Sequence, residues 1–187
     1  MSPRSLVVTG AASGIGQAVA VGAARDGWFV HMLDLDPEGA AATVDLVREA
    51  GGDGRTHVLD VTDAAAVEAA VGALADVGPP LRGLFAGAGI DVGGAAHELD
   101  PGTWRRVLDV NVTGTFLVVR QALRTMIAGD GGSVVLCSSP AATVGFAAGG
   151  ATAYGASKGA ISSMVRTLAV DYARHGVRVN ADRKSVV

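Results

Sequence analysis

The sequence predicts an α/β protein in which helices cover both faces of a doubly wound parallel sheet, giving three layers. Short Val-rich and Leu-rich runs alternate along the chain with longer segments of helical character, which is typical of strands joined by crossover helices. The mainly Val and Leu character of these runs is typical of strands buried on both faces. The 187 residues contain no repeat and no linker, so we expect one domain.

The expected elements follow from these runs and from the residues that flank them. The strands are expected at residues 5–9, 28–34, 56–60, 81–86, 132–138 and 177–180. The helices are expected at residues 15–25, 37–50, 63–77, 103–126 and 157–175. Two helix start signals are present, Asp36 followed by Pro37 and Thr62 followed by Asp63. Gly51 provides a helix stop.

The composition excludes several classes of partner. The net charge is −3 and no basic cluster stands out, so we expect no nucleic acid partner. No apolar run reaches the ~18 residues of a membrane span. Cys137 is the only cysteine and cannot form an internal disulfide, so we expect a buried strand thiol and a reducing, cytoplasmic environment. None of the four histidines has ligand-like neighbours, and we expect no metal.

A glycine-rich turn lies where the first strand ends and the first helix begins. Gly10, Gly14 and Gly16 let the backbone turn sharply and approach a pyrophosphate closely. The free amides and the positive end of the helix dipole stabilise the charge of such a group. We therefore expect a dinucleotide to bind at this turn, in contact also with Ser13 and Ile15.

The second strand ends in a carboxylate that fits the same site. Asp34 lies 18 residues after Gly16, close to the ~20 expected for the acid that accepts a hydrogen bond from a ribose hydroxyl. It would repel the extra phosphate of NADP, and neither Arg nor Lys follows it, so NAD is expected in preference to NADP. A solvated carboxylate at a strand end remains the alternative for Asp34.

Tyr154 and Lys158 are four residues apart and would share one face of a helix. A phenol with a pKa of ~10 is a poor base near neutral pH unless a cation stabilises the phenolate. A charge at ~4 Å contributes up to ~4 kcal/mol at an effective dielectric constant of ~20, which makes Lys158 a candidate for this cation. A packing tyrosine and a surface lysine are the alternative.

With these motifs, residues 6–181 resemble the short-chain dehydrogenase/reductase family. The resemblance rests on the spacing Gly10-x3-Gly14-x-Gly16, on Tyr154-x3-Lys158, and on further matches. These matches are Asp60 and Val61 after the third strand, Ala88 and Gly89 after the fourth, Ser138 and Ser139 after the fifth, and Asn111. The resemblance implies a Rossmann fold and NAD(P)-dependent hydride transfer between the cofactor and a secondary alcohol or ketone.

The resemblance also implies roles for individual residues. Asn111, Ser139, Tyr154 and Lys158 would form the catalytic tetrad, and the last two would also contact the cofactor. Ser139, rather than Ser138, would polarise the substrate oxygen. Asn111 would hold a water that links Lys158 to solvent, although it could instead bond helix backbone.

The cofactor contacts implied by the resemblance lie after two strands. Asp60 and Val61 would reach the adenine, and Ala88 and Gly89 would pass close to the cofactor.

The chain departs from the family pattern in two places. Ala86 and Gly87 replace two asparagines that the family usually carries, so we expect their amide hydrogen bonds to be absent or replaced. The connection over residues 140–153 contains Gly145, Gly149 and Gly150 and is longer than expected for the family. We expect it to reshape the mouth of the substrate site.

The family pattern ends at Ala181. The residues 182–187 can be encoded by codons that resemble a common sequencing adapter, so we expect a non-native tail after an incomplete domain at 1–181. The resemblance implies that the last strand and the C-terminal helices are missing, that this chain is itself inactive, and that the full-length protein is a dimer or tetramer.

Two other functions share parts of this sequence pattern. A non-catalytic dinucleotide-binding sensor or scaffold of the same fold would keep the glycine turn but would not need Asn111, Ser139, Tyr154 and Lys158 together. Epimerases and dehydratases of the extended relatives are disfavoured by the spacing of the glycines.

Overall fold

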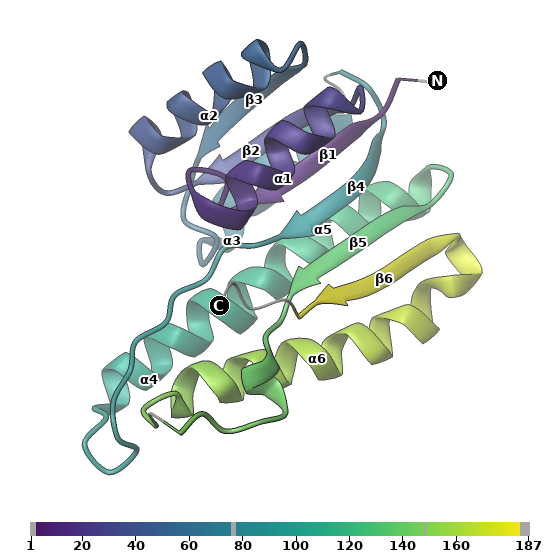
Figure 1. The fold of residues 1–187 in the computed structure, drawn as a ribbon. Helices are drawn as coiled ribbons and strands as arrows, with labels where there is room; N and C mark the ends of the chain where they lie inside the picture. The colour runs from purple at the N-terminus through teal and green to yellow at the C-terminus, as the bar shows by residue number, and fades with distance from the viewer. Residues whose placement is uncertain (1–2, 76–77, 148, 184–187) are drawn as a thin grey trace.

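The computed structural model describes residues 3–75, 78–147 and 149–183. Six parallel strands form one sheet in the order β3-β2-β1-β4-β5-β6 (Figure 1). The strands are β1 (Ser5–Thr9), β2 (Phe29–Asp34), β3 (Asp53–Val58), β4 (Leu81–Ala86), β5 (Gly132–Cys137) and β6 (Val177–Asp182). This order reverses between β1 and β4, as in a doubly wound Rossmann sheet. The predicted fold class is confirmed.

Helices lie on both faces of the sheet, and each face has its own apolar cluster. The helices are α1 (Gly14–Arg25), α2 (Pro37–Glu49), α3 (Ala64–Gly72), α4 (Pro101–Leu108), α5 (Thr115–Ala128) and α6 (Thr152–Tyr172). On one face, α1 and α2 contribute Ala20, Ala24 and Val47 to a cluster with β1 and β2. On the other face, α3, α5 and α6 pack on β1, β4, β5 and β6, with Val67, Val118 and Ile161 in the shared core.

The start signals read from the sequence act as helix caps. The Asp36 carboxylate accepts a hydrogen bond from the Glu38 amide at 3.0 Å, with Pro37 in the first turn of α2. The Asp63 carboxylate accepts from the amides of Ala65 and Ala66, each at 3.0 Å. Both helices therefore begin where their caps predict.

Several boundaries differ from the predictions. β3 is displaced to residues 53–58 because it pairs with the whole of β2, from Phe29 opposite Asp53 to Asp34 opposite Val58. The helix predicted at 103–126 is three segments, in which a π-helix over Asp109–Gly114 separates α4 from α5. The end of the helix predicted at 63–77 lies outside the described residues, which show α3 followed by a 3-10 turn at Ala73–Ala75.

The last helix and strand are longer than expected. α6 begins at Thr152, five residues before its predicted start, after Gly149 and Gly150 with φ of +68° and +78°. Tyr154 is therefore helical. β6 extends through Asp182, whose carbonyl accepts a hydrogen bond from the Ser138 amide at 2.8 Å. The strand thus passes the expected domain boundary by one residue, and residues 184–187 lie outside the described part.

One part of the sheet is less covered than the rest. α1 and α2 pack on β1, β2 and β3, whereas Val135 and Cys137 of β5 point to the same face and are only half-buried. Arg178 and Asn180 of β6 are exposed. Figure 1 shows α1 over β1 and no helix drawn over the same side of β5 and β6.

Candidate active site

The glycine turn joins β1 to α1 at the carboxyl end of the sheet. Gly10 and Gly14 have φ of +69° and +54°, a conformation that L side chains rarely adopt. A Cβ on Gly16 would lie 2.0 Å from the Gly10 carbonyl oxygen, so only glycine fits there. A Cβ on Gly14 would meet nothing within 4 Å, because this residue borders an open cleft. The turn therefore brings bare backbone and the N-terminus of α1 to the cleft.

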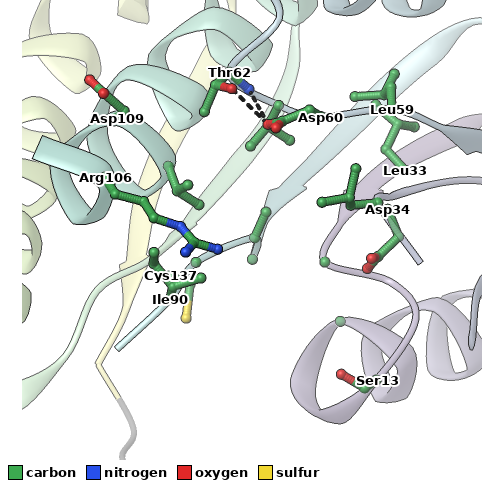
Figure 2. A pocket seen from close by; sticks show the side chains of 18 of the residues that line it. Ser13, Leu33, Asp34, Leu59, Asp60, Thr62, Ile90, Arg106, Asp109 and Cys137 are labelled. Carbon is green, nitrogen blue, oxygen red and sulfur yellow. Dashed lines mark hydrogen bonds between the residues drawn. The ribbon is translucent and has the colours of Figure 1, made fainter. Parts of the chain in front are cut away.

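The cleft has a volume of about 710 Å³ and lies where the strand order reverses, between the ends of β1 and β4 (Figure 2). Open α/β sheets bind ligands at this switch point. The residues expected to contact the cofactor that line it are Gly10, Ser13, Gly14, Ile15, Gly16, Asp34, Asp60, Val61, Ala88 and Gly89. A glycine cradle, a helix N-terminus and a strand-end carboxylate on one cleft fit a dinucleotide.

Two carboxylates on the cleft wall are fixed by backbone amides. Asp34 accepts hydrogen bonds from the Ala12 amide at 2.9 Å and the Asp36 amide at 3.0 Å. Asp60 accepts from both the amide and the hydroxyl of Thr62, each at 2.8 Å. The two acids are thus held at the ends of β2 and β3, and Asp34 is tied directly to the glycine turn.

The hydroxyl of Thr9 holds the segment that lacks the two asparagines. Thr9 Oγ1 accepts hydrogen bonds from the amides of Gly87 and Ala88, each at 3.1 Å. A Cβ on Gly87 would lie 2.5 Å from the Phe85 ring, so the chain passes very close to its neighbours. β1 therefore fixes the turn after β4 directly through the Thr9 hydroxyl.

Ser139 and Lys158 meet Tyr154 next to the end of β5. The Lys158 side chain is buried and its Nζ donates to the Cys137 carbonyl oxygen at 2.7 Å. The same Nζ lies 5.4 Å from the centroid of the Tyr154 ring. The Ser139 hydroxyl accepts from the Ala141 amide at 3.2 Å and interacts with the Tyr154 phenol. These three side chains therefore form one group.

Ser138 has a structural environment instead. Its buried hydroxyl lies 2.7 Å from the Ser162 hydroxyl and donates to the Lys158 carbonyl oxygen at 3.2 Å. It ties the end of β5 to α6. The geometry favours Ser139 over Ser138 as the residue that meets the substrate.

Burial dominates the titration of the Tyr154 and Lys158 pair. It raises the pKa of Tyr154, which is partly offset by the hydrogen bond with Ser139, and negative charge on Cys137 and Asp91 raises this pKa further. Burial also lowers the pKa of Lys158. The Lys158 ammonium bonds the Cys137 carbonyl oxygen, and stabilisation of the phenolate by Lys158, helped by an oxidised nicotinamide, stays a prediction.

Asn111 lies in the π-helix and joins three segments. Its Oδ1 accepts from the Ile90 amide at 2.8 Å, and its Nδ2 donates to the Ile90 carbonyl and to the Ser157 hydroxyl, each at 2.9 Å. A π-turn inside a helix is frequent at functional sites because it redirects a side chain. The Asn111 side chain thus bonds to α6 and to the loop that follows β4. The backbone of its own helix is not among these partners.

None of the four expected catalytic residues is among those that line the cleft, but Asn111 and Lys158 bond to residues that do. Gly89, Ile90 and Cys137 line its catalytic end. Lys158 bonds to Cys137, and Asn111 bonds to Ile90. Cys137 was expected to be buried, but it is half-exposed because the end of β5 lacks a covering helix on that face. Figure 2 shows its sulfur on the cleft wall.

The structure adds lining residues that sequence reasoning missed. They are Leu33, Leu35, Leu59, Thr62, Gly87, Ile90, Gly102, Arg105, Arg106, Asp109, Val110 and Cys137. The lining residues from α4 and the π-helix recur every three or four positions, so they lie on one face of the helix. That periodicity was visible in the sequence, but nothing local indicated that this face borders the cleft.

The long connection between Ser139 and Tyr154 encloses space of its own. A second cavity of about 450 Å³ is lined by Ala142, Val144, Phe146, Gly150 and neighbouring residues. The Gly94 amide donates to the Gly150 carbonyl at 2.9 Å, which ties this connection to the segment after β4. The glycine-rich connection is therefore attached to the catalytic end of the cleft.

A dinucleotide cleft with a tyrosine, lysine, serine and asparagine gathered at one end defines the class of nicotinamide-dependent oxidoreductases. Residues 4–183 match the family model described as short chain dehydrogenase. The chain belongs to the short chain dehydrogenase family.

Named relatives agree with this assignment. The chain is 39% identical over 176 residues to 2-(S)-hydroxypropyl-CoM dehydrogenase 3 of Xanthobacter autotrophicus, covering 94% of the chain and 68% of that protein. It is 39% identical to D-threitol dehydrogenase of Mycolicibacterium smegmatis, covering 97% of the chain and 69% of that protein. The chain thus spans about two thirds of the length of these relatives.

A solved structure supports the same conclusion. Carveol dehydrogenase from Mycobacterium avium in complex with NAD superposes with a TM-score of 0.91 at 28% identity, over 97% of this chain and 70% of that one.

Within the described residues, no helix combines the length and apolar character needed to span a membrane.

Proposed function

We propose that the full natural protein transfers a hydride between NAD(H) and a secondary alcohol or ketone. The observation that carries this proposal is the group formed by Ser139, Tyr154 and Lys158 beside the end of the dinucleotide cleft. A sensor or scaffold of the same fold would need the glycine turn, but it would not need these side chains in one place.

Each side chain has a distinct task in this reaction. When bound, the nicotinamide supplies the hydride acceptor or donor. In the oxidation direction, the alcohol loses a proton to Tyr154 Oη as its carbon loses a hydride. The Ser139 hydroxyl holds the reacting oxygen. Lys158 and Asn111 connect the phenol to solvent through a bound water.

NAD is the proposed cofactor, in preference to NADP. Asp34 is fixed by two backbone amides on the cleft wall, where it would accept from ribose hydroxyls and repel a phosphate. The next residue, Leu35, also lines the cleft and offers no positive charge. The NAD in the related carveol dehydrogenase structure supports this choice.

We propose that the full protein is a cytoplasmic homo-oligomer, a dimer or tetramer. Phe116 and Ile127 of α5 and Val170 of α6 are exposed apolar side chains, and Val170 is 78% exposed. Exposed apolar groups of this kind favour protein contacts. Light scattering of the purified protein would give its mass, and a monomer would contradict this assembly.

Tyr154→Phe tests the proposed function in the full natural protein. Alcohols and ketones are screened with NAD and NADP by following the absorbance of the reduced nicotinamide. The variant should lose about 10²-fold or more in kcat, because the acid/base hydroxyl is gone, while the Kd for NADH stays within about twofold.

Tyr172→Phe is the matched control, since Tyr172 lies at the far end of α6, beside His175. It should keep full activity. Retained turnover in Tyr154→Phe would remove Tyr154 from its role. A wild-type protein that binds NADH but turns over no alcohol or ketone would favour the sensor.

A further inference from the structure

A guanidinium from α4 points into the cofactor cleft. Arg106 lines the cleft, and Figure 2 shows its side chain reaching from α4 toward the part of the cleft that Ile90 and Cys137 border. The Asp109 carboxylate, on the next turn, points away from it in the same view. The positive charge of Arg106 therefore faces the space that a ligand would occupy.

Arg106 has no protein partner within the described part of the chain. The arginine side chains that form ion pairs there with carboxylates are Arg48, Arg82 and Arg124. The acids on the opposite wall of the cleft, Asp34 and Asp60, already accept hydrogen bonds from Ala12, Asp36 and Thr62. The guanidinium donors of Arg106 thus remain available to a ligand.

The opposite wall offers groups that also attract anions. Gly14 begins α1, and the positive end of this helix borders the cleft with the bare backbone of the glycine turn. A guanidinium presents five N–H donors in a planar fork that matches a phosphate or carboxylate. The cleft therefore carries donors for oxyanions on both walls.

We propose that Arg106 is an oxyanion-binding residue of this cleft, holding a negatively charged oxygen group of the bound ligand. The inference rests on the proposed function, because two ligands of that reaction could carry such a group. One source is the diphosphate of the dinucleotide. The other is an acid group on the substrate, which would place hydroxy acids or keto acids among the substrates.

The test compares Arg106→Gln and Arg106→Lys with Arg48→Gln in the full natural protein. Arg48 is the matched control, because its exposed ion pair with Asp45 lies on α2 outside the cleft. One arm measures the Kd for NADH by nicotinamide fluorescence at two salt concentrations. The other arm measures the rise in Tm that 3-hydroxybutyrate and 2-butanol, which differ by an acid group, give to the NAD-saturated protein.

If the cofactor diphosphate is the source, Arg106→Gln raises the Kd for NADH about tenfold and weakens its salt dependence, and Arg106→Lys lies between. If the substrate is the source, the Kd stays within twofold, and the preference for 3-hydroxybutyrate over 2-butanol is lost in Arg106→Gln.

Arg48→Gln should match the wild type in both arms. The proposal is overturned if Arg106→Gln matches the wild type in both arms, including the case in which neither alcohol shifts the Tm. Neither arm requires turnover, so an absence of catalysis would count against the proposed function alone.

Discussion

Two single carboxylates, Asp34 and Asp91, are expected to control the cofactor selectivity and the pH response of the site. Asp34 lies where the ribose is expected, and Asp91 lies close enough to Tyr154 to raise the pKa of its phenol. Neither effect depends on a large surface, because charges interact over several ångströms in a partly buried site. Both residues can therefore be tested by replacing one or two side chains.

Asp34→Ser combined with Leu35→Arg should move the preference from NAD toward NADP. The serine removes a charge that repels the additional phosphate, and the arginine supplies a partner for it. The ratio of kcat/KM for NADP to that for NAD should rise about tenfold or more. Leu35→Gln alone is the control. An unchanged ratio in the double variant would show that Asp34 does not face the ribose.

Asp91→Asn should make alcohol oxidation possible at lower pH. The Asp91 charge raises the pKa of Tyr154, so removing it lowers that pKa and leaves more phenolate at any given pH. The rising limb of the pH profile of kcat/KM should therefore move to lower pH. Glu98→Gln, a neutralised acid in the same segment, should leave the limb in place. A limb that stays or moves upward in Asp91→Asn contradicts this view.

At the scale of elements, the site depends on contacts between the ends of neighbouring strands. β1 and β4 are adjacent at the switch point, and the hydroxyl at the end of β1 holds the first two amides after β4. Asn111 does the same for Ile90, two residues after Ala88. The segment from Gly87 to Ile90 is thus held by side chains from two other elements.

Thr9→Val tests the first of these contacts. The substitution conserves shape but leaves the Ala88 amide without its acceptor, whereas the Gly87 amide keeps its bond to the Thr9 carbonyl oxygen at 3.2 Å. Thr9 is only 2% exposed. The free energy of unfolding should fall by about 1–3 kcal/mol, the penalty of an unsatisfied buried donor, and the Kd for NADH should rise. Urea unfolding and fluorescence titration measure both.

Thr9→Ser is the control, since it retains the hydroxyl. A Thr9→Val protein as stable as the wild type would mean that the turn after β4 has another support.

At the scale of the whole molecule, β6 is the edge strand of the described sheet. Edge strands present unpaired backbone groups and promote association unless they are covered. The neighbouring face of β5 carries Val135 and Cys137, which are only half-buried. The edge and this face form one continuous region at the same side of the sheet.

The 187-residue chain, expressed alone, should therefore be poorly soluble and inactive, unlike the full natural protein. Its relatives are longer, since the chain covers 68% and 69% of two of them. Soluble yield, mass in solution and NAD-linked turnover of the two forms provide the comparison. A soluble and active 187-residue form would show that β6 and the open face need no further cover.

The sequence by itself determined the features that depend on neighbours along the chain. The class of fold, the strands β1 and β4, the caps Asp36 and Asp63, and the glycine turn all follow from local periodicity and backbone geometry. The Tyr154 and Lys158 pair belongs to this group, because two residues that are four positions apart on a helix share a face.

Only the tertiary structure decided which distant groups meet. The partners of Asn111 are Ile90 and Ser157, and Thr9 supports the turn after β4. Arg105 and Arg106 both line the cleft. The pKa of Tyr154 is raised rather than lowered for the same reason. Burial and long-range contacts arise from packing of the whole sheet, so they cannot be predicted from residue spacing along the chain.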